Sequence, residues 1–146
     1  MQTKKSLYDS DFYQWALYNA ELLKQGKFTE IDIDNIAEEL EDMGKNNKRE
    51  LESRLMVLIM HLLKWQYQPI RRSESWRATI NTQRVEIERL LKNSPSLKHN
   101  IETVIDEAFK DAAISFEDET GIDKKHLLQT CPYTFEQLRD RSFRPD

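Results

Sequence analysis

The fold is decided by the stretch from Leu51 to Arg84, which reads LESRLMVLIMHLLKWQYQPIRRSESWRATINTQR. It contains the longest apolar run of the chain, Leu55 to Leu63, and two of the three tryptophans. Apolar residues recur at helical spacing before Pro69 and again after Ser73. The stretch therefore predicts two helices joined by a short loop. The first of them, from about Lys45 to Tyr67, is expected to be central and buried.

Helical periodicity continues through the rest of the chain, in which glycine and proline are scarce. Further helices are predicted over residues 11–25, 34–43, 74–92 and 96–121, with a short helix from Thr134 to Arg141. Gly44 is expected to end the second of these as a C-cap. The sequence thus predicts an all-α fold, a compact bundle of about five helices. The core is placed in residues 9–121 of one domain, with residues 122–146 packed on it as a tail.

Two apolar stripes are expected to face this core from the N-terminal helices. Phe12, Trp15, Ala16, Asn19, Leu22 and Leu23 form one of them, and Ile33, Ile36, Ala37 and Leu40 form the other. The other faces of the second helix are acidic, with Glu38, Glu39, Glu41 and Asp42. Asp32 or Asp34 is predicted to cap its first turn.

Composition and charge exclude several classes of protein. A net charge of −4 argues against a general nucleic-acid coat, although a local basic patch is compatible with it. The single cysteine, Cys131, has no partner for an internal disulfide. The first fifteen residues lack the apolar run of a signal peptide, and the run from Leu55 to Leu63 is too short to span a bilayer. These features indicate a cytoplasmic protein.

The main anomaly of the sequence is a pair of polar residues, Arg54 and His61, on a helix face that should be apolar. At 100° per residue they lie about 20° apart around the helix and two turns apart along it. The spacing looks like the Arg-x(4–6)-His motif of HEPN-type nucleases, small helical domains in which a cation and an imidazole act on RNA, usually in a dimer. The alternative is structural, with His61 hydrogen-bonded inside the bundle and Arg54 paired to a glutamate.

Basic and aromatic residues alternate in the segment Lys64, Trp65, Tyr67, Arg71, Arg72, Trp76, Arg77 and Arg84. Such a segment can stack bases and hold phosphates, which makes nucleic-acid binding through the Arg71/Arg72 region one hypothesis. The competing interpretation is an internal network in which Glu38 and Glu39 pair with Arg71, Arg72 or Arg84, surrounded by His61, Trp65 and Trp76. We favour the internal network.

Other chemistry has weaker support. Asp34, Glu38, Glu41 and His61 contain no Glu-x-x-His pair, the usual mark of di-iron bundles, so neither a metal nor another cofactor is predicted. Cys131 precedes Pro132, and nothing nearby suggests an activated thiol. No catalytic motif stands out, and the chain is not expected to be an enzyme.

One family resemblance covers nearly the whole chain. It is carried by Asp11-Phe12 with Trp15, Ala37-Glu38-Glu39-Leu40, His61-Leu62-Leu63-Lys64-Trp65, Tyr67-Gln68-Pro69, Arg71-Arg72-Ser73, Ser75-Trp76, Thr79-Ile80, Gln83-Arg84, Ser94-Pro95-Ser96-Leu97 and Glu119-Thr120-Gly121. In these motifs the chain resembles the bacterial, largely cyanobacterial domain-of-unknown-function family number twenty-nine. The resemblance implies an all-helical fold and no established activity.

Three functions remain as hypotheses from the sequence. The first is a non-enzymatic interaction module that binds a partner protein, and because the helix ending at Tyr67 has apolar residues on more than one face, self-association is compatible with it. The second is an RNA-cleaving dimer that uses Arg54 and His61. The third is nucleic-acid binding without cleavage.

Overall fold

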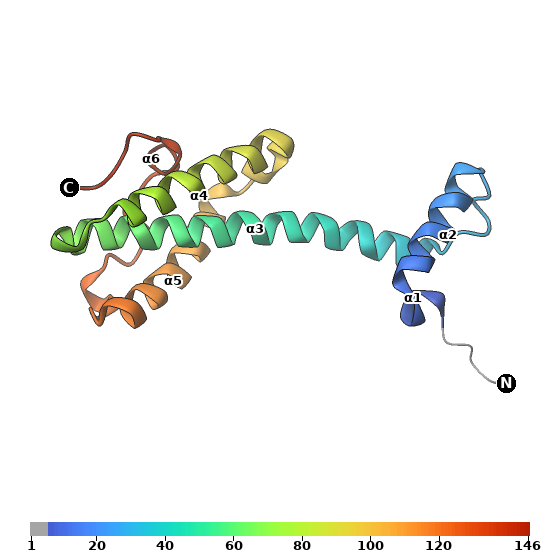
Figure 1. Ribbon diagram of the computed structural model, residues 1–146, viewed down its shortest axis with the longest axis horizontal. Coiled ribbons are helices and arrows are strands. Elements are labelled where there is room, and N and C mark those ends of the chain that lie inside the picture. Colours follow the sequence, from blue (N-terminus) through green and yellow to red (C-terminus); the bar gives the residue numbers. More distant parts are fainter. Residues whose placement is uncertain (1–5) are drawn as a thin grey trace. The chain divides into compact units, whose positions relative to one another are not determined.

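The computed structural model describes residues 6–146, and every regular element in that range is helical (Figure 1). The α-helices are α1 (Leu7–Ser10), α2 (Phe12–Lys24), α3 (Ile33–Tyr67), α4 (Glu74–Asn93), α5 (Ile101–Thr120) and α6 (Phe135–Arg139). Three short 3-10 helices are η1 (Pro69–Arg71), η2 (Pro95–Lys98) and η3 (Lys124–His126). The prediction of an all-α fold is confirmed. None of the helices described is long and apolar enough to cross a membrane.

Local chemistry explains most helix ends. The side chains of Asp11, Ser73 and Thr134 accept hydrogen bonds from the first turns of α2, α4 and α6, as N-caps do. Asp32 does the same for α3, because its carboxylate accepts from the backbone N–H of Asn35. Gly121 ends α5 with a φ of +75°, a left-handed conformation that glycine adopts at little cost.

Three predicted boundaries are wrong. Gly44 was expected to end a helix, but α3 continues through it from Ile33 to Tyr67. Its φ is not positive, so it does not adopt the left-handed conformation of a C-cap glycine. The helix expected from residue 96 is instead η2 followed by α5, since Asn100, at a φ of +58°, breaks the helix between them. Asparagine tolerates this left-handed conformation better than most residues. The last helix ends at Arg139, two residues earlier than predicted.

The chain forms two compact units, of which one ends at Lys45 and the other spans Asn46–Asp146. We call residues 6–45 the N-terminal unit and residues 46–146 the C-terminal unit. The single domain expected from the sequence stays a prediction.

The C-terminal unit contains the larger core, where α4 and α5 lie along the later turns of α3 (Figure 1). Its buried side chains from α3 are Leu51, Leu55, Leu58, Ile59, Met60, Leu62, Leu63 and Trp65. The buried apolar side chains from α4 and α5 are Ile80, Ile87, Leu91, Val104, Ile105, Ala108, Phe109, Ala112, Ala113 and Phe116, and those from the tail are Leu127, Tyr133 and Leu138. Arg54 and His61 lie at the margin of this core and are partly buried.

The N-terminal unit has a small core made by α1, α2 and the first turns of α3. Buried side chains in residues 6–45 are Trp15, Asn19 and Leu22. The Trp15 indole donates to the Asp32 carboxylate over 2.9 Å, and the Asn19 side chain accepts from the Asp32 backbone over 2.8 Å. Tyr8 packs against Trp15 and donates its hydroxyl to Glu39, which raises the pKa of Tyr8 to about 12.

Several residues that were expected to face the core of the bundle are exposed. Phe12 is 50% exposed and Leu23 43%, while Ile33 and Leu40 are 62% and 63% exposed. The periodicity identified residues that share a helix face correctly, but the described residues of the N-terminal unit leave these side chains 43% to 63% exposed.

Candidate functional site

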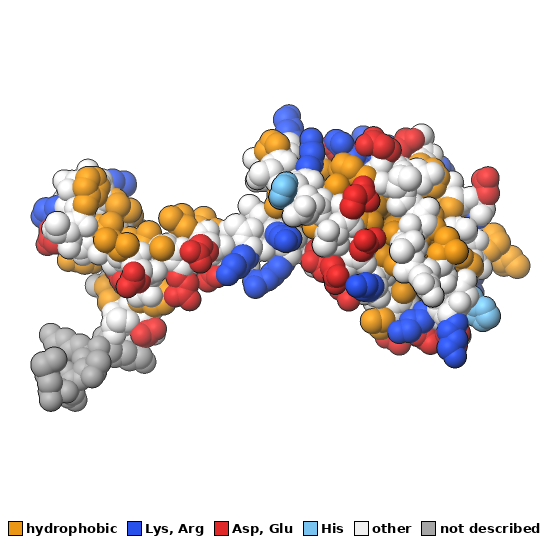
Figure 2. All heavy atoms as spheres, turned by 180° about the vertical axis from the view of Figure 1, so that it is seen from behind, with side chains coloured by type: hydrophobic (Ala, Val, Ile, Leu, Met, Phe, Trp, Pro, Cys, Tyr) orange, Lys and Arg blue, Asp and Glu red, His pale blue; other side chains and the backbone are white. Residues whose placement is uncertain are grey.

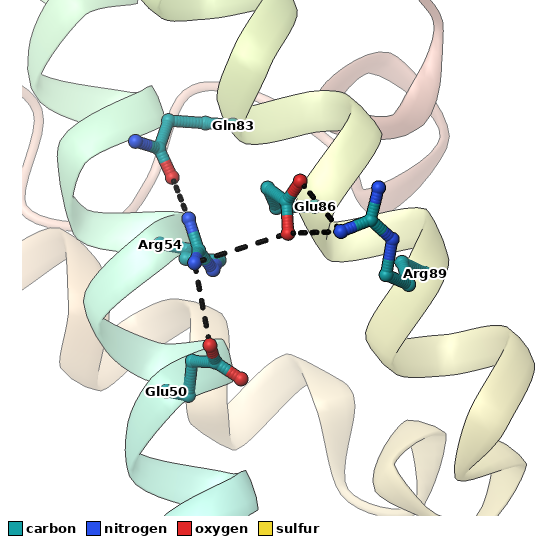
Figure 3. A network of polar contacts seen from close by, with 5 residues as sticks. All are labelled: Glu50, Arg54, Gln83, Glu86 and Arg89. Carbon is teal, nitrogen blue, oxygen red and sulfur yellow. Dashed lines mark hydrogen bonds and ion pairs between the residues drawn. The ribbon is translucent and has the colours of Figure 1, made fainter.

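Arg54 is held by acceptors on two helices, as Figure 3 shows. Its guanidinium donates to Glu50 one turn earlier and to Gln83 on α4, each over 3.3 Å. Glu86 on α4 lies 3.9 Å away and also pairs with Arg89 over 3.1 Å. The Arg54 Nε is buried without a partner in the described part of the chain. This arrangement links α3 to α4 and engages both terminal nitrogens of the guanidinium in contacts within the chain.

His61 is oriented by its own helix. Its Nδ1 lies 2.8 Å from the carbonyl oxygen of Val57, and because a carbonyl only accepts, Nδ1 carries the proton. Burial lowers the pKa of His61, although the hydrogen bond to Val57 acts in the opposite direction. The imidazole is therefore neutral at pH 7, with Nε2 as its remaining acceptor.

Arg54 and His61 are separated by about 10 Å along the helix axis, at 1.5 Å per residue. Each has a separate set of partners, and no hydrogen bond joins them within residues 6–146. RNA cleavage by this pair stays a prediction. The part of the chain that the structure describes contains no group of three metal-ligating side chains.

Three arginines surround the buried indole of Trp65, which is 8% exposed. Arg72 lies 5.0 Å from the ring centroid and donates to the Trp65 carbonyl over 2.8 Å. Arg77 lies 5.7 Å and Arg144 5.4 Å from the same ring. The cluster joins α3, the start of α4 and the end of the tail through cation–π contacts. Because the indole is covered, it offers no open face for stacking a base.

Lys64 and Trp76 make a second cation–π contact nearby. The Lys64 ammonium lies 5.0 Å from the Trp76 ring and 2.8 Å from the carboxylate of Glu119 on α5. Arg71, by contrast, is exposed at the end of η1. Of the predicted basic-aromatic segment, Arg71 and Arg77 are therefore the arginines whose side chains are open to solvent, and Trp65 is the aromatic that is most enclosed.

Arg84 is 1% exposed and binds the tail. Its Nε donates to the carbonyl oxygen of Leu138 over 2.9 Å and its Nη2 to that of Gln137 over 3.1 Å. These carbonyls lie in the last turn of α6, where helical acceptors lack partners and a cation is favourable. Burial lowers the pKa of Arg84 to about 10. Arg84 therefore satisfies carbonyls of the tail, where the sequence had suggested a carboxylate partner.

Two more contacts hold the tail on the C-terminal unit. Arg139 makes paired hydrogen bonds of 2.7 and 3.1 Å to Glu88 on α4, which lower the pKa of that carboxyl. The Tyr133 hydroxyl donates to Gln66 over 2.7 Å. Cys131, in the same tail, is partly buried, and burial raises the pKa of its thiol to about 11. A thiol with that pKa is protonated at neutral pH and is a weak nucleophile.

Glu38 and Glu39 belong to the N-terminal unit, whereas Arg71, Arg72 and Arg84 belong to the C-terminal unit. Glu39 accepts from Tyr8, and Glu38 is exposed. The pairing of these glutamates with the arginines would be a contact between residues of different units, and it stays a prediction.

The N-terminal unit carries an extensive apolar surface that sequence reasoning missed. The large apolar side chains that are 43% to 75% exposed here are Phe12, Tyr13, Leu17, Tyr18, Leu23, Phe28, Ile33, Leu40 and Met43. Figure 2 shows hydrophobic side chains gathered over this unit. A signal was present in the sequence, because apolar residues surround α2 on all sides, which is typical of a helix that is covered all round.

The net negative charge of the chain is concentrated in the same unit. Residues 6–45 contain ten carboxylates and three lysines, a net charge of −7, compared with −4 for the whole chain. No ion pair forms within residues 6–45. The surface is therefore both apolar and strongly acidic.

The fold and these sites define an all-α protein with a helical core around α3 and an apolar, acidic N-terminal unit. The chain belongs to the family described as Domain of unknown function DUF29, whose family model matches residues 7–144. The family resemblance predicted from the sequence motifs is thereby confirmed. Searches of curated proteins and of solved structures each found no match.

Proposed function

We propose that this protein is a non-enzymatic, cytoplasmic interaction module that binds a partner protein through its N-terminal unit. The observation that carries the proposal is the set of nine large apolar side chains exposed within residues 6–45. Soluble monomers rarely expose this many large apolar side chains in so short a segment, and extensive exposed apolar surface commonly marks an interaction site.

The energetics of burial support binding at this surface. Burying a fully exposed Leu, Ile or Phe side chain is worth about 1.5–3 kcal/mol, so a side chain that is about 60% exposed contributes roughly 1–2 kcal/mol. Nine such side chains together contribute on the order of 9–18 kcal/mol. Association costs about 4–15 kcal/mol in lost freedom of motion. The gain from burial is thus of the same size as this cost or larger, so association at this surface requires a partner that covers most of the nine side chains.

The polar groups of the C-terminal unit favour a structural role over catalysis. Arg54, Arg84 and Arg139 each bridge separate segments of the chain, and His61 bonds its own helix. The Cys131 thiol has a raised pKa. The three arginines and His61 therefore hold the C-terminal unit together, and Cys131 is a poor nucleophile.

Photo-crosslinking in the host organism tests the proposal. A benzoylphenylalanine placed at Leu17 or Met43 should give a discrete crosslinked product, whereas the same group at Leu128, which is 63% exposed in the C-terminal unit, should give none. Leu40→Ser should reduce the product without unfolding the protein, because Leu40 is exposed. Equal crosslinking at Leu17, Met43 and Leu128, or no product at Leu17 and Met43, would contradict the proposal.

Nucleic-acid binding is a second candidate function, favoured by the gathering of Arg72, Arg77 and Arg144 around Trp65. Since the indole is covered, binding would rest on phosphate contacts and would weaken steeply with salt. Arg71→Glu tests it cleanly because Arg71 is exposed. Binding of a labelled single-stranded RNA that falls at least about threefold in this variant, and falls further between 50 and 200 mM salt, supports the candidate. Unchanged binding would show that Arg71 does not contact the RNA.

A further inference from the structure

The first turns of α3 expose a continuous apolar stripe. Ile33, Leu40 and Met43 are 62%, 63% and 62% exposed. At 100° per residue they lie within about 80° of one another around the helix. Ala37 and Gly44 lie on the same side, and open space surrounds the position of a Cβ at Gly44. Small residues at these positions allow another helix to approach closely.

Carboxylates flank this stripe on both sides, but on only one side are they without partners within the N-terminal unit. Asp32 and Glu39 accept hydrogen bonds from Trp15 and Tyr8 and so belong to the small core of the N-terminal unit. On the other side Asp34, Glu38 and Glu41 are exposed and form no ion pair within residues 6–45. Residues 28–44 contain seven carboxylates and no basic side chain.

We propose that this stripe docks a basic amphipathic helix of a partner protein, an inference that rests on the proposed function and names its partner class. The apolar face of the partner helix covers Ile33, Leu40 and Met43. Its lysines and arginines pair with the free carboxylates along the edge, since complementary charge directs such association. The partner helix packs its apolar face against the apolar stripe of α3, with contacts at the i, i+3, i+4 and i+7 spacing of an amphipathic helix.

Charge selects this occupant over a second copy of the same stripe. Two copies brought face to face would place their free carboxylates against each other, with no basic residue between positions 28 and 44 to neutralise them. Like charges in such close apposition oppose association. A basic helix meets no such repulsion.

Fluorescence anisotropy on the full chain tests the proposal with three labelled synthetic peptides. The first is an 18-residue peptide of leucine and lysine with leucines at helical spacing. The second has the same composition in an order that leaves no apolar face, and the third replaces each lysine with glutamate. Only the first is expected to bind, and its affinity should fall as salt is raised from 50 to 500 mM.

Matched variants locate the binding site. Leu40→Ser and the double change Glu38→Lys with Glu41→Lys should each weaken binding of the first peptide by at least about tenfold. Leu128→Ser and Asp118→Lys, at exposed positions of the C-terminal unit, should change it less than about twofold. Circular dichroism confirms that each variant is folded.

The inference would be overturned by binding of the reordered peptide with equal affinity, by no effect of Leu40→Ser, or by dimerisation of the chain that Leu40→Ser abolishes. The last result would make the occupant a second copy. A crosslinked partner at Met43 together with no peptide binding would reject the basic helix and leave the interaction module standing. Absence of any crosslinked partner would reject the interaction module itself.

Discussion

Replacing Arg84 with methionine should destabilise the protein by about 1–3 kcal/mol, because the guanidinium satisfies two carbonyls of the tail from a buried position. Two hydrogen bonds from a charged donor are worth about 3–6 kcal/mol together. Against this, removing the buried charge returns roughly 3 kcal/mol, since burial lowers the pKa of Arg84 to about 10 from 12.5. The buried carbonyl of Leu138 then lacks a partner, which keeps the net change unfavourable.

Urea unfolding followed by near-ultraviolet circular dichroism measures this change. Arg89→Met is the matched control, because Arg89 lies on the same helix with a side chain that is 63% exposed and pairs only with Glu86 among the described carboxylates. An exposed ion pair of this kind contributes about 0–1 kcal/mol. Trypsin should also cut after Arg141 faster in Arg84→Met than in the control. Equal stability of the two variants would refute the role assigned to Arg84.

Three further changes test other parts of the structure. Gly44→Ala should raise the free energy of unfolding by about 0.5–1 kcal/mol, since Gly44 lies within a helix, whereas a C-cap with positive φ would make the change destabilising. Burial lowers the pKa of His61, so the unfolded chain takes up the proton first and stability should fall as pH drops below about 6.5. Urea unfolding at pH 7 and pH 5 should show a smaller loss for His61→Gln. Because burial raises the pKa of Cys131 to about 11, iodoacetamide should alkylate the native protein slowly at pH 8 and speed up in urea, and fast labelling of the native thiol would count against its burial.

Local features of the sequence predicted most of the fold. The caps at Asp11, Ser73 and Thr134 and the helix end at Gly121 depend on neighbours within a few residues, and the structure has them where the sequence placed them. Gly44 could not be predicted in this way, because a glycine at this position is compatible both with a C-cap that ends a helix and with the interior of a longer helix. Only the conformation of the whole helix decides between the two.

The candidate site was harder to predict because its contacts are not local. Arg84 binds carbonyls 53 and 54 residues further along the chain, and Arg144 reaches Trp65 from the tail. Helical spacing could not reveal either contact. The same limit applies to Ile33 and Leu40: periodicity shows that they share a face, but it does not show whether another part of the chain covers that face.

Native mass spectrometry of the protein purified gently from its own host tests the central claim most directly. The account predicts that the wild-type chain, of 17.4 kDa, carries a bound partner protein and that the double variant Leu17→Ser with Leu40→Ser appears as a bare monomer. Both substitutions are at exposed positions of the N-terminal unit, so the variant should remain folded. A wild-type chain that appears bare, or a partner that the double variant retains in equal amount, would contradict the account.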